Sequence, residues 1–290
     1  MSYDSHTSDS STRSPLDRFG FEHLLAVTTL FVAGTIVLGV AARVTGSGLA
    51  CNANWPVCDG GFLNLLPQGR PSFYEWIHRV VAGTAGLFIV GTAAAAWRAG
   101  GVGRRVTALV TLGLVLTPVQ ILLGRETVLS YELEILSMHF WTAIAIFVVY
   151  VVAAVTVWST RLTRTHVTAA LGLAAVAVPV QLVLSPLFIQ GYTDVTMTIQ
   201  MAATLTLVGA VILAAMVGPR RFADRRLVGV LFATPVLTFL VLLLGRRSVM
   251  TFAPALDQLY TLTTAVLFAA LLAAAWLARR GGDTRSPLSA

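Results

Sequence analysis

Three ionisable side chains stand at the edges of long apolar stretches of this sequence. Glu75 and His78 are three residues apart at the start of one stretch, so on a helix they would share a face. His139 stands near the head of another stretch. Imidazoles ligate metals, and a carboxylate acts as a base or stabilises developing charge. Since ionisable groups inside a membrane are costly, these residues predict a functional site.

The composition indicates what kind of protein positions these side chains. The chain has 290 residues, of which 56% are hydrophobic and 11% charged, and its mean hydropathy is +0.80. These values are typical of an all-α protein of the cell membrane rather than of a soluble domain. The formal charge is +7, but the arginines occur in pairs between apolar runs, which is typical of the cytoplasmic loops of helical membrane proteins and argues against a nucleic-acid partner.

Eight apolar runs of about 20 residues are long enough to span roughly 30 Å of hydrocarbon. They lie near 23–45, 75–97, 105–124, 136–158, 166–187, 195–217, 226–245 and 257–278. Residues 1–22 form a polar tail without the apolar segment of a signal peptide, and we expect this tail to be disordered. Residues 281–290 form a second tail.

The arginines are distributed unequally between the two sides of these spans. Fourteen lie on the side that holds both termini and four on the other side, apart from Arg43 and Arg79 near span ends. The positive-inside rule then predicts that both termini are cytoplasmic. Glu75, His78 and His139 accordingly lie near the outer surface.

His78 and His139 lie about one turn inside the same boundary, on different spans. Two neutral imidazoles at matching depth on separate helices are what bis-histidine ligation of a haem iron requires. We expect the two rings to hold a haem between them, with structural roles for both as the alternative. His6, His23 and His166 are too far from this boundary, and we assign them no function.

The chain contains an internal repeat. Residues 122–129 (LLGRETVL) recur as 243–250 (LLGRRSVM), at an offset of 121. At this offset His139 corresponds to Tyr260. Chance similarity between apolar helices is the alternative interpretation.

The repeat predicts two tandem four-helix bundles, over 23–160 and 166–280. Both bundles begin on the same side and contain four spans, so we expect a pseudo-two-fold axis along the membrane normal. With one residue of slippage His78 aligns with Gln200. Only the first bundle therefore keeps its histidines, and the second would hold a degenerate haem site.

The loop between the first two spans holds the only two cysteines, Cys51 and Cys58, with Pro56 between them. Two thiols six residues apart outside the membrane are well placed for a disulfide. The pair serves either as a structural staple or as a redox centre, and the sequence leaves both roles open.

Other polar residues near these spans have more than one possible role. Glu75 would orient the nearby histidine, bind a cation or act on a substrate carbon, unless it is merely solvated. Arg70, Arg79 and Arg125 suit haem propionates as charge-assisted donors, or they extend to lipid phosphates. Gln120, inside the third span, lines the pocket or bonds a neighbouring helix.

Taken together, these motifs closely resemble the heme A synthase family, eight-helix membrane proteins of cytochrome oxidase assembly. The resemblance is specific over about 40–145 and weaker beyond. It is carried by Thr45-Gly46-Ser47-Gly48-Leu49, Cys51, Asn54-Trp55-Pro56-Val57-Cys58, Glu75-x-x-His78-Arg79, Gln120-x-x-x-Gly124-x-x-Thr127-Val128-Leu129 and His139.

The resemblance implies that the N-terminal half binds heme O and oxidises its C8 methyl to a formyl group, giving heme A by successive hydroxylations and loss of water. It implies that His78 and His139 ligate the substrate haem and that Glu75 is the family's essential carboxylate. Cys51 and Cys58 match an outer-loop pair that looks like a disulfide. Heme O synthase and a cytochrome oxidase subunit are the implied protein partners.

The second half departs from the family pattern, which commonly has another histidine pair that holds a heme b. The aligned residues here are Gln200 and Tyr260, and no histidine follows His166. We therefore expect no bis-histidine heme b and at most one haem per chain, although ligation by Tyr260 is an alternative. Three interpretations follow for the C-terminal half: a one-haem synthase passes its electrons by another route, the half serves only as a scaffold, or the chain has lost its activity.

Two other functions compete with heme A synthesis. The first is a non-catalytic haem-binding protein that transfers heme O or heme A during oxidase assembly. The second is a membrane thiol oxidoreductase centred on Cys51 and Cys58.

Overall fold

The computed structural model describes residues 20–47, 55–56, 69–130, 132–185, 187–189, 193–250 and 253–283. Within these ranges the chain forms eight α-helices and no strand. They are α1 (Phe21–Val44), α2 (Arg70–Arg98), α3 (Arg104–Leu129), α4 (Leu133–Trp158), α5 (Arg164–Val183), α6 (Asp194–Arg221), α7 (Arg225–Met250) and α8 (Pro254–Asp283). Each helix is long and apolar enough to cross a membrane. The predicted all-α class with eight spans is confirmed, and the chain is a multi-pass membrane protein.

The helices differ from the predicted spans at the ends where the site residues lie. α2 begins at Arg70, with a proline in its first turn, so Glu75 lies in the second turn. α3 continues to Leu129 and therefore carries Arg125 on the helix rather than in a loop. The length of an apolar run indicates which residues lie in the hydrocarbon, but the α-helical hydrogen bonding continues beyond the ends of that run. α5 ends at Val183, earlier than predicted.

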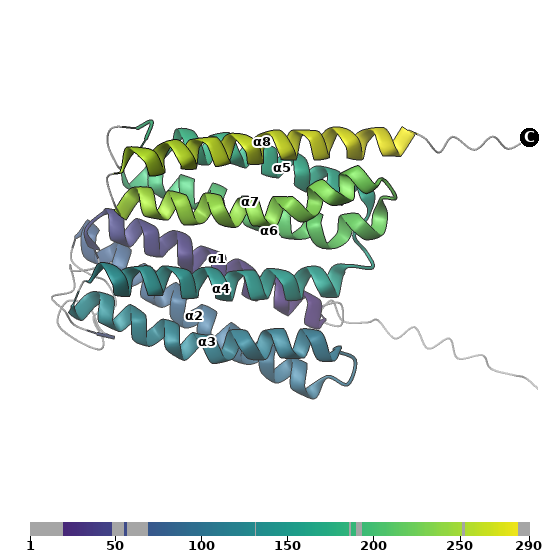
Figure 1. Ribbon diagram of the computed structural model, residues 1–290. Helices are drawn as coiled ribbons and strands as arrows, with labels where there is room; N and C mark the ends of the chain where they lie inside the picture. The colour runs from purple at the N-terminus through teal and green to yellow at the C-terminus, as the bar shows by residue number, and fades with distance from the viewer. Residues whose placement is uncertain are drawn as a thin grey trace, which may run out of the picture.

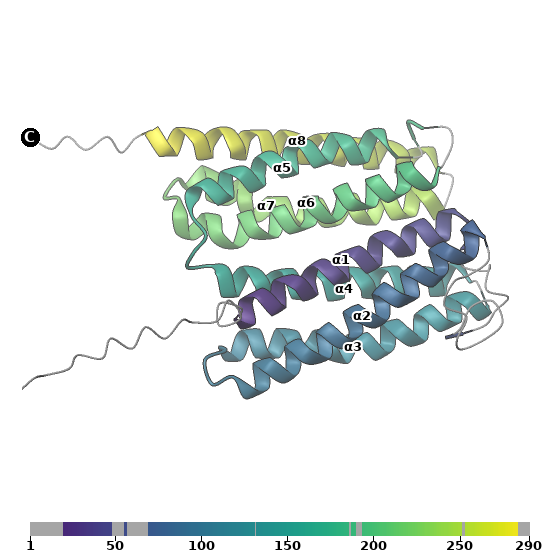
Figure 2. The ribbon, with the colours of Figure 1, turned by 180° about the vertical axis from the view of Figure 1, so that it is seen from behind.

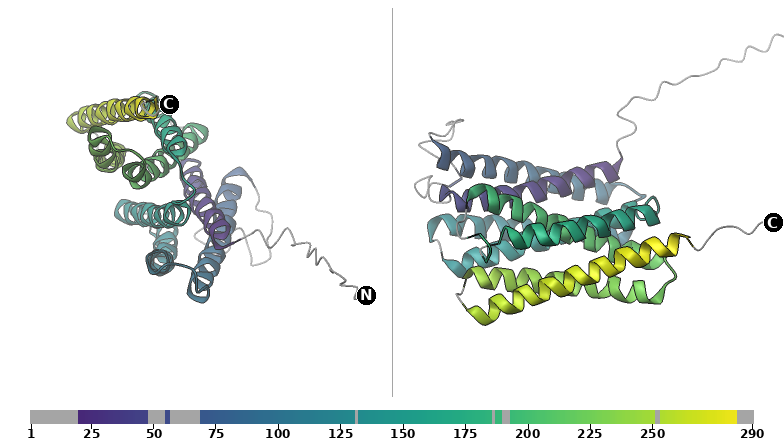
Figure 3. Two further views of the ribbon diagram at one scale, coloured as in Figure 1. Left: turned by 90° about the vertical axis from the view of Figure 1, so that its right-hand side faces the viewer. Right: turned by 90° about the horizontal axis from the view of Figure 1, so that it is seen from above.

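The helices pack most closely in sequential antiparallel pairs, α1 with α2, α3 with α4, α5 with α6 and α7 with α8. α1 also packs against α4, and α5 packs against α8 in the same way. Each half of the chain is thus a ring of four helices. Figures 1 and 2 show α1–α4 on one side and α5–α8 on the other, and the left panel of Figure 3 shows the two groups along their axes.

Contacts between the halves centre on α6, which packs against both α1 and α4. Side chains add a second connection, because the ring of Trp141 on α4 lies 5.9 Å from that of Phe239 on α7, measured between centroids. The neighbour pattern within each half repeats. The two-fold axis between the halves stays a prediction.

Small side chains allow α5 and α6 to approach closely. Ala174 on α5 and Ala214 on α6 are fully buried, and Ala170, Ala177 and Ala210 are nearly so. This packing fixes the ends of α5 and α6 relative to each other, and both ends contribute to the site described below.

The two ends of the bundle are distinct. α1, α3, α5 and α7 finish at the end where α2, α4, α6 and α8 begin, which we call the site end and which lies on the left of Figure 1. α1 begins and α8 finishes at the opposite end. The prediction that this opposite end faces the cytoplasm rests on the arginine distribution.

Candidate functional site

A cavity of about 520 Å³ lies between the helices at the site end. Its walls come from the last turns of α1, α3, α5 and α7 and the first turns of α2, α4, α6 and α8. Glu75, His78, Gln120 and His139 all line it. The volume falls within the range of about 300–1,000 Å³ that is usual for small-molecule sites. Four residues chosen from the sequence therefore share one cavity, which also extends into the C-terminal half.

Each histidine packs against a glycine of the preceding helix. A Cβ added to Gly39 on α1 would lie 3.0 Å from Cε1 of His78. A Cβ added to Gly124 on α3 would likewise lie 3.0 Å from Cε1 of His139. Both approaches are closer than ordinary van der Waals contact, so any larger residue at either glycine would displace the ring. The glycines thus provide the space in which the two imidazoles sit.

The hydrogen bonding of the imidazoles leaves ring nitrogens available. The amide nitrogen of Gln120 lies 3.3 Å from Nε2 of His139. Nδ1 of His139 and Nδ1 of His78 are buried and have no hydrogen-bond partner. Metal-binding histidines are commonly held through one nitrogen and bind through the other, so Gln120 is placed to orient His139.

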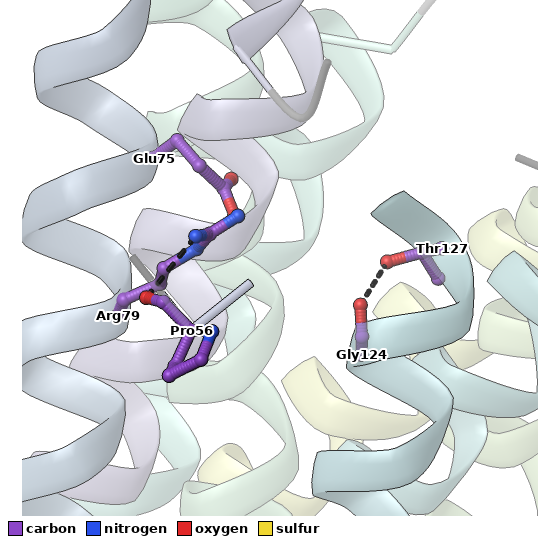
Figure 4. A network of polar contacts seen from close by, with 5 residues as sticks. All are labelled: Pro56, Glu75, Arg79, Gly124 and Thr127. Carbon is purple, nitrogen blue, oxygen red and sulfur yellow. Dashed lines mark hydrogen bonds and ion pairs between the residues drawn. The ribbon is translucent and has the colours of Figure 1, made fainter. Parts of the chain in front are cut away.

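Glu75 is held as an ion pair. Its carboxylate oxygen Oε1 accepts a hydrogen bond from Nε of Arg79, one turn further along α2, at 2.9 Å. Nη1 of Arg79 donates to the carbonyl oxygen of Pro56 at 3.2 Å. Figure 4 shows this chain of contacts, with Gly124 and Thr127 on α3 to its right. The Glu75 residue is only 6% exposed, so the carboxylate is fixed at the cavity wall.

Arg125, predicted from the sequence as a haem-binding residue, is not part of the cavity wall. Arg125 is exposed and pairs with the adjacent Glu126 at 2.6 Å. Cys51 and Cys58, for which a disulfide is predicted, lie outside the residues that the structure describes, as does the side chain of Arg70.

The C-terminal half completes the cavity with a different set of groups. A Cβ on Gly245 would lie 3.0 Å from Cε2 of Tyr260, which repeats the arrangement of Gly124 and His139 at the sequence offset of 121. Nε2 of Gln200 donates to the backbone carbonyl of Gln181 at 3.0 Å. All these residues line the cavity, so the positions aligned with the two histidines face it as well.

Several lining residues were not chosen from the sequence. Gln181 and Ser185 are 4% and 2% exposed, and the Gln181 amide nitrogen and the Ser185 hydroxyl are buried without hydrogen-bond partners. Gln181 ends a Pro-Val-Gln tripeptide in α5, and Gln120 ends an identical tripeptide in α3. The second occurrence of this tripeptide would have identified Gln181 from the sequence. Arg43 and Arg246 also line the cavity, and no sequence pattern distinguishes them from the exposed arginines.

A haem is compatible with these groups. The two imidazoles, each with an unpartnered ring nitrogen, would ligate the iron of a bound haem. The wall is otherwise mostly apolar or neutral, which suits a macrocycle. Among the residues that the structure describes, no group of three or more His, Cys, Asp or Glu is placed to hold a bare metal ion.

Comparison with curated proteins identifies relatives with two kinds of name. The Halobacterium salinarum protein named protoheme IX farnesyltransferase is 37% identical over 134 residues, which is 46% of this chain and 28% of that protein. Heme A synthase of Bacillus licheniformis is 31% identical over 115 residues, 39% of this chain and 37% of the synthase. Heme A synthase of Bacillus pumilus is 30% identical over 146 residues, 49% of this chain and 47% of the synthase. Less than half the length of each of these proteins is spanned, and no family model matches the chain.

Proposed function

We propose that the chain oxidises the C8 methyl of heme O to a formyl group, giving heme A, and the partial matches to heme A synthases support this proposal. The observation that best supports this proposal is the single cavity in which His78, His139 and Glu75 meet. Two potential iron ligands and one fixed carboxylate are the groups that this reaction requires from the protein.

The two imidazoles hold the substrate in this proposal. His78 and His139 ligate the iron of heme O from opposite helices, and Gln120 fixes the orientation of the His139 ring. The bound haem is itself the substrate, and oxidation of its methyl group would release four electrons to an acceptor that binds outside this cavity. The protein contributes position, because glycines behind both rings determine where the imidazoles sit.

Glu75 acts on the reacting side chain of the substrate. Its carboxylate is held by Arg79 and cannot rotate away from the wall without breaking that pair. Oxidation of a methyl to a formyl group adds one oxygen atom net, at the level of water, and releases four protons and four electrons. The twice-hydroxylated carbon then loses water to give the formyl group. A fixed carboxylate is suited to transfer these protons and to stabilise positive charge nearby.

The C-terminal half contributes walls rather than a second haem in this proposal. Tyr260 and Gln200 occupy the positions that align with the histidines, and they face the same cavity as His78 and His139. One haem per chain is therefore the expected content, and the electron acceptor binds elsewhere.

The activity test is expression of the chain together with a heme O synthase, followed by extraction and chromatography of the pigments. We expect heme A in the extract. Heme O alone, with the protein confirmed in the membrane, would contradict the proposal. A second culture without the heme O synthase tests the reaction named for the farnesyltransferase relatives, because heme O produced there would identify the chain as the transferase.

Substitution of either glycine behind a histidine should weaken haem binding. A methyl group at Gly39 or Gly124 would press on the imidazole, and overpacking of this kind typically costs about 1–3 kcal/mol, which corresponds to roughly 5- to 150-fold in affinity. Spectroscopic titration of the purified Gly39→Ala and Gly124→Ala variants with haem measures the change. Gly83→Ala on α2 is the matched control, because a Cβ there meets no atom within 4 Å. Equal affinities in all three variants would show that the rings do not hold the haem.

A further inference from the structure

Arg246 on α7 stands out among the cationic side chains of the site end. It lines the cavity, and its Nε and Nη2 atoms are buried without any hydrogen-bond partner. Its guanidinium carbon lies 5.0 Å from the centroid of the Phe140 ring on α4, so the group is held across the junction between the two halves. Burying a guanidinium whose N–H donors have no acceptor is costly, which indicates that a ligand in the cavity accepts these hydrogen bonds.

The corresponding arginine of the first repeat has a different environment. Arg125 and Arg246 occupy the same position in the repeated segments, but Arg125 is followed by Glu126 and Arg246 by Arg247. Arg125 pairs with its neighbouring carboxylate on the exposed surface. Arg246 has a like charge beside it and points to Phe140 and the cavity instead. A single acid-to-base difference thus leaves one arginine neutralised and the other available.

The charge of the cavity wall is unbalanced around this group. Arg43 and Arg246 both line the cavity, so two like charges face the same space. Among the described lining residues Glu75 is the sole carboxylate, and it is already paired with Arg79. The wall therefore presents two guanidinium groups to whatever occupies the cavity, and the favoured occupant carries an oxyanion.

We propose that Arg246, assisted by Arg43, binds a carboxylate of the molecule that occupies the cavity, which for a porphyrin is a propionate. The inference rests on the proposed function, since it takes the occupant to be a haem. It gives the C-terminal half a direct part in the haem site of the N-terminal half. The half that lacks histidines then anchors the acidic edge of the same substrate.

The test compares two probes that differ only in charge at this edge. Purified full-length protein is titrated with ferric protoporphyrin IX and with its dimethyl ester, and binding is followed by the Soret band. We expect the wild type to bind the free acid about 10- to 100-fold more tightly than the ester, as is usual for a charge-assisted hydrogen bond. In Arg246→Gln this preference should fall to less than about threefold, while affinity for the ester stays unchanged.

Two further variants keep the result interpretable. Arg247→Gln alters the adjacent, exposed arginine and should retain the full preference for the acid. Arg246→Lys keeps the charge but not the planar pair of donors, so it should retain part of the preference and guards against misfolding of Arg246→Gln.

The outcomes separate this inference from the proposed function. A bis-histidine haem spectrum with equal affinity for acid and ester would overturn the role of Arg246 and leave the haem site intact. No haem binding at all would overturn both. A phospholipid that copurifies with the wild type but not with Arg246→Gln, together with equal affinity for the two probes, would assign the oxyanion to a lipid headgroup and would also overturn the inference.

Discussion

Glu75→Gln should abolish heme A formation while haem remains bound. The amide has nearly the shape of the carboxylate but cannot accept a proton or stabilise positive charge in the same way. Removing one fixed electrostatic group from a site of this kind typically lowers turnover about 100- to 1,000-fold. Pigments extracted after expression with a heme O synthase should therefore contain heme O or partly oxidised haem in place of heme A. A haem-transfer protein would lose nothing from this substitution.

The control for Glu75→Gln is Glu126→Gln. Both glutamates pair with an arginine, but Glu75 does so at the cavity wall and Glu126 on the exposed surface beside Arg125. Glu126→Gln should leave heme A production unchanged. If Glu75→Gln proves unstable because Arg79 has lost its partner, the double variant Glu75→Gln/Arg79→Met removes the unpaired charge. Normal heme A levels in a folded variant without Glu75 would eliminate the catalytic role.

His139→Ala should remove the low-spin spectrum of a bis-imidazole haem and lower haem affinity by more than about 100-fold. This magnitude exceeds the usual 10- to 100-fold effect of losing a residue that only orients a metal ligand. His78→Ala should have the same effect, since each ring supplies one axial ligand in the proposal. Absorption spectra and haem-to-protein ratios of the purified variants provide the measurement.

His166→Ala is the matched control for the two ligands. His166 lies in the first turn of α5, at the end of the bundle opposite the site, where its Nδ1 accepts a hydrogen bond from the backbone N–H of Thr163 at 3.2 Å. We expect its haem content to equal that of the wild type. A low-spin haem that persists in both His78→Ala and His139→Ala would show that the iron is held by other residues.

The sequence determined the class of this protein and the depth of its key residues. Every residue of a helix advances about 1.5 Å along the axis, so counting from the start of an apolar run fixes how far inside the boundary a side chain lies. That is why His78 and His139 were predicted at one level and are found at the walls of one cavity. The apolar runs did not predict the helix ends, because the backbone of α2 and α3 stays helical through the charged residues beyond those runs.

Which direction each side chain faces was decided by the tertiary structure alone. Arg125 and Arg246 share a depth and a repeat position, yet one is exposed and paired with Glu126 whereas the other lines the cavity beside Phe140. The glycines behind the histidine rings, and the extension of the cavity to Gln181 and Tyr260, likewise depend on which helices become neighbours. The rise per residue is fixed within a single helix. The direction in which a side chain points depends on how two helices pack, and that packing involves residues distant in the chain.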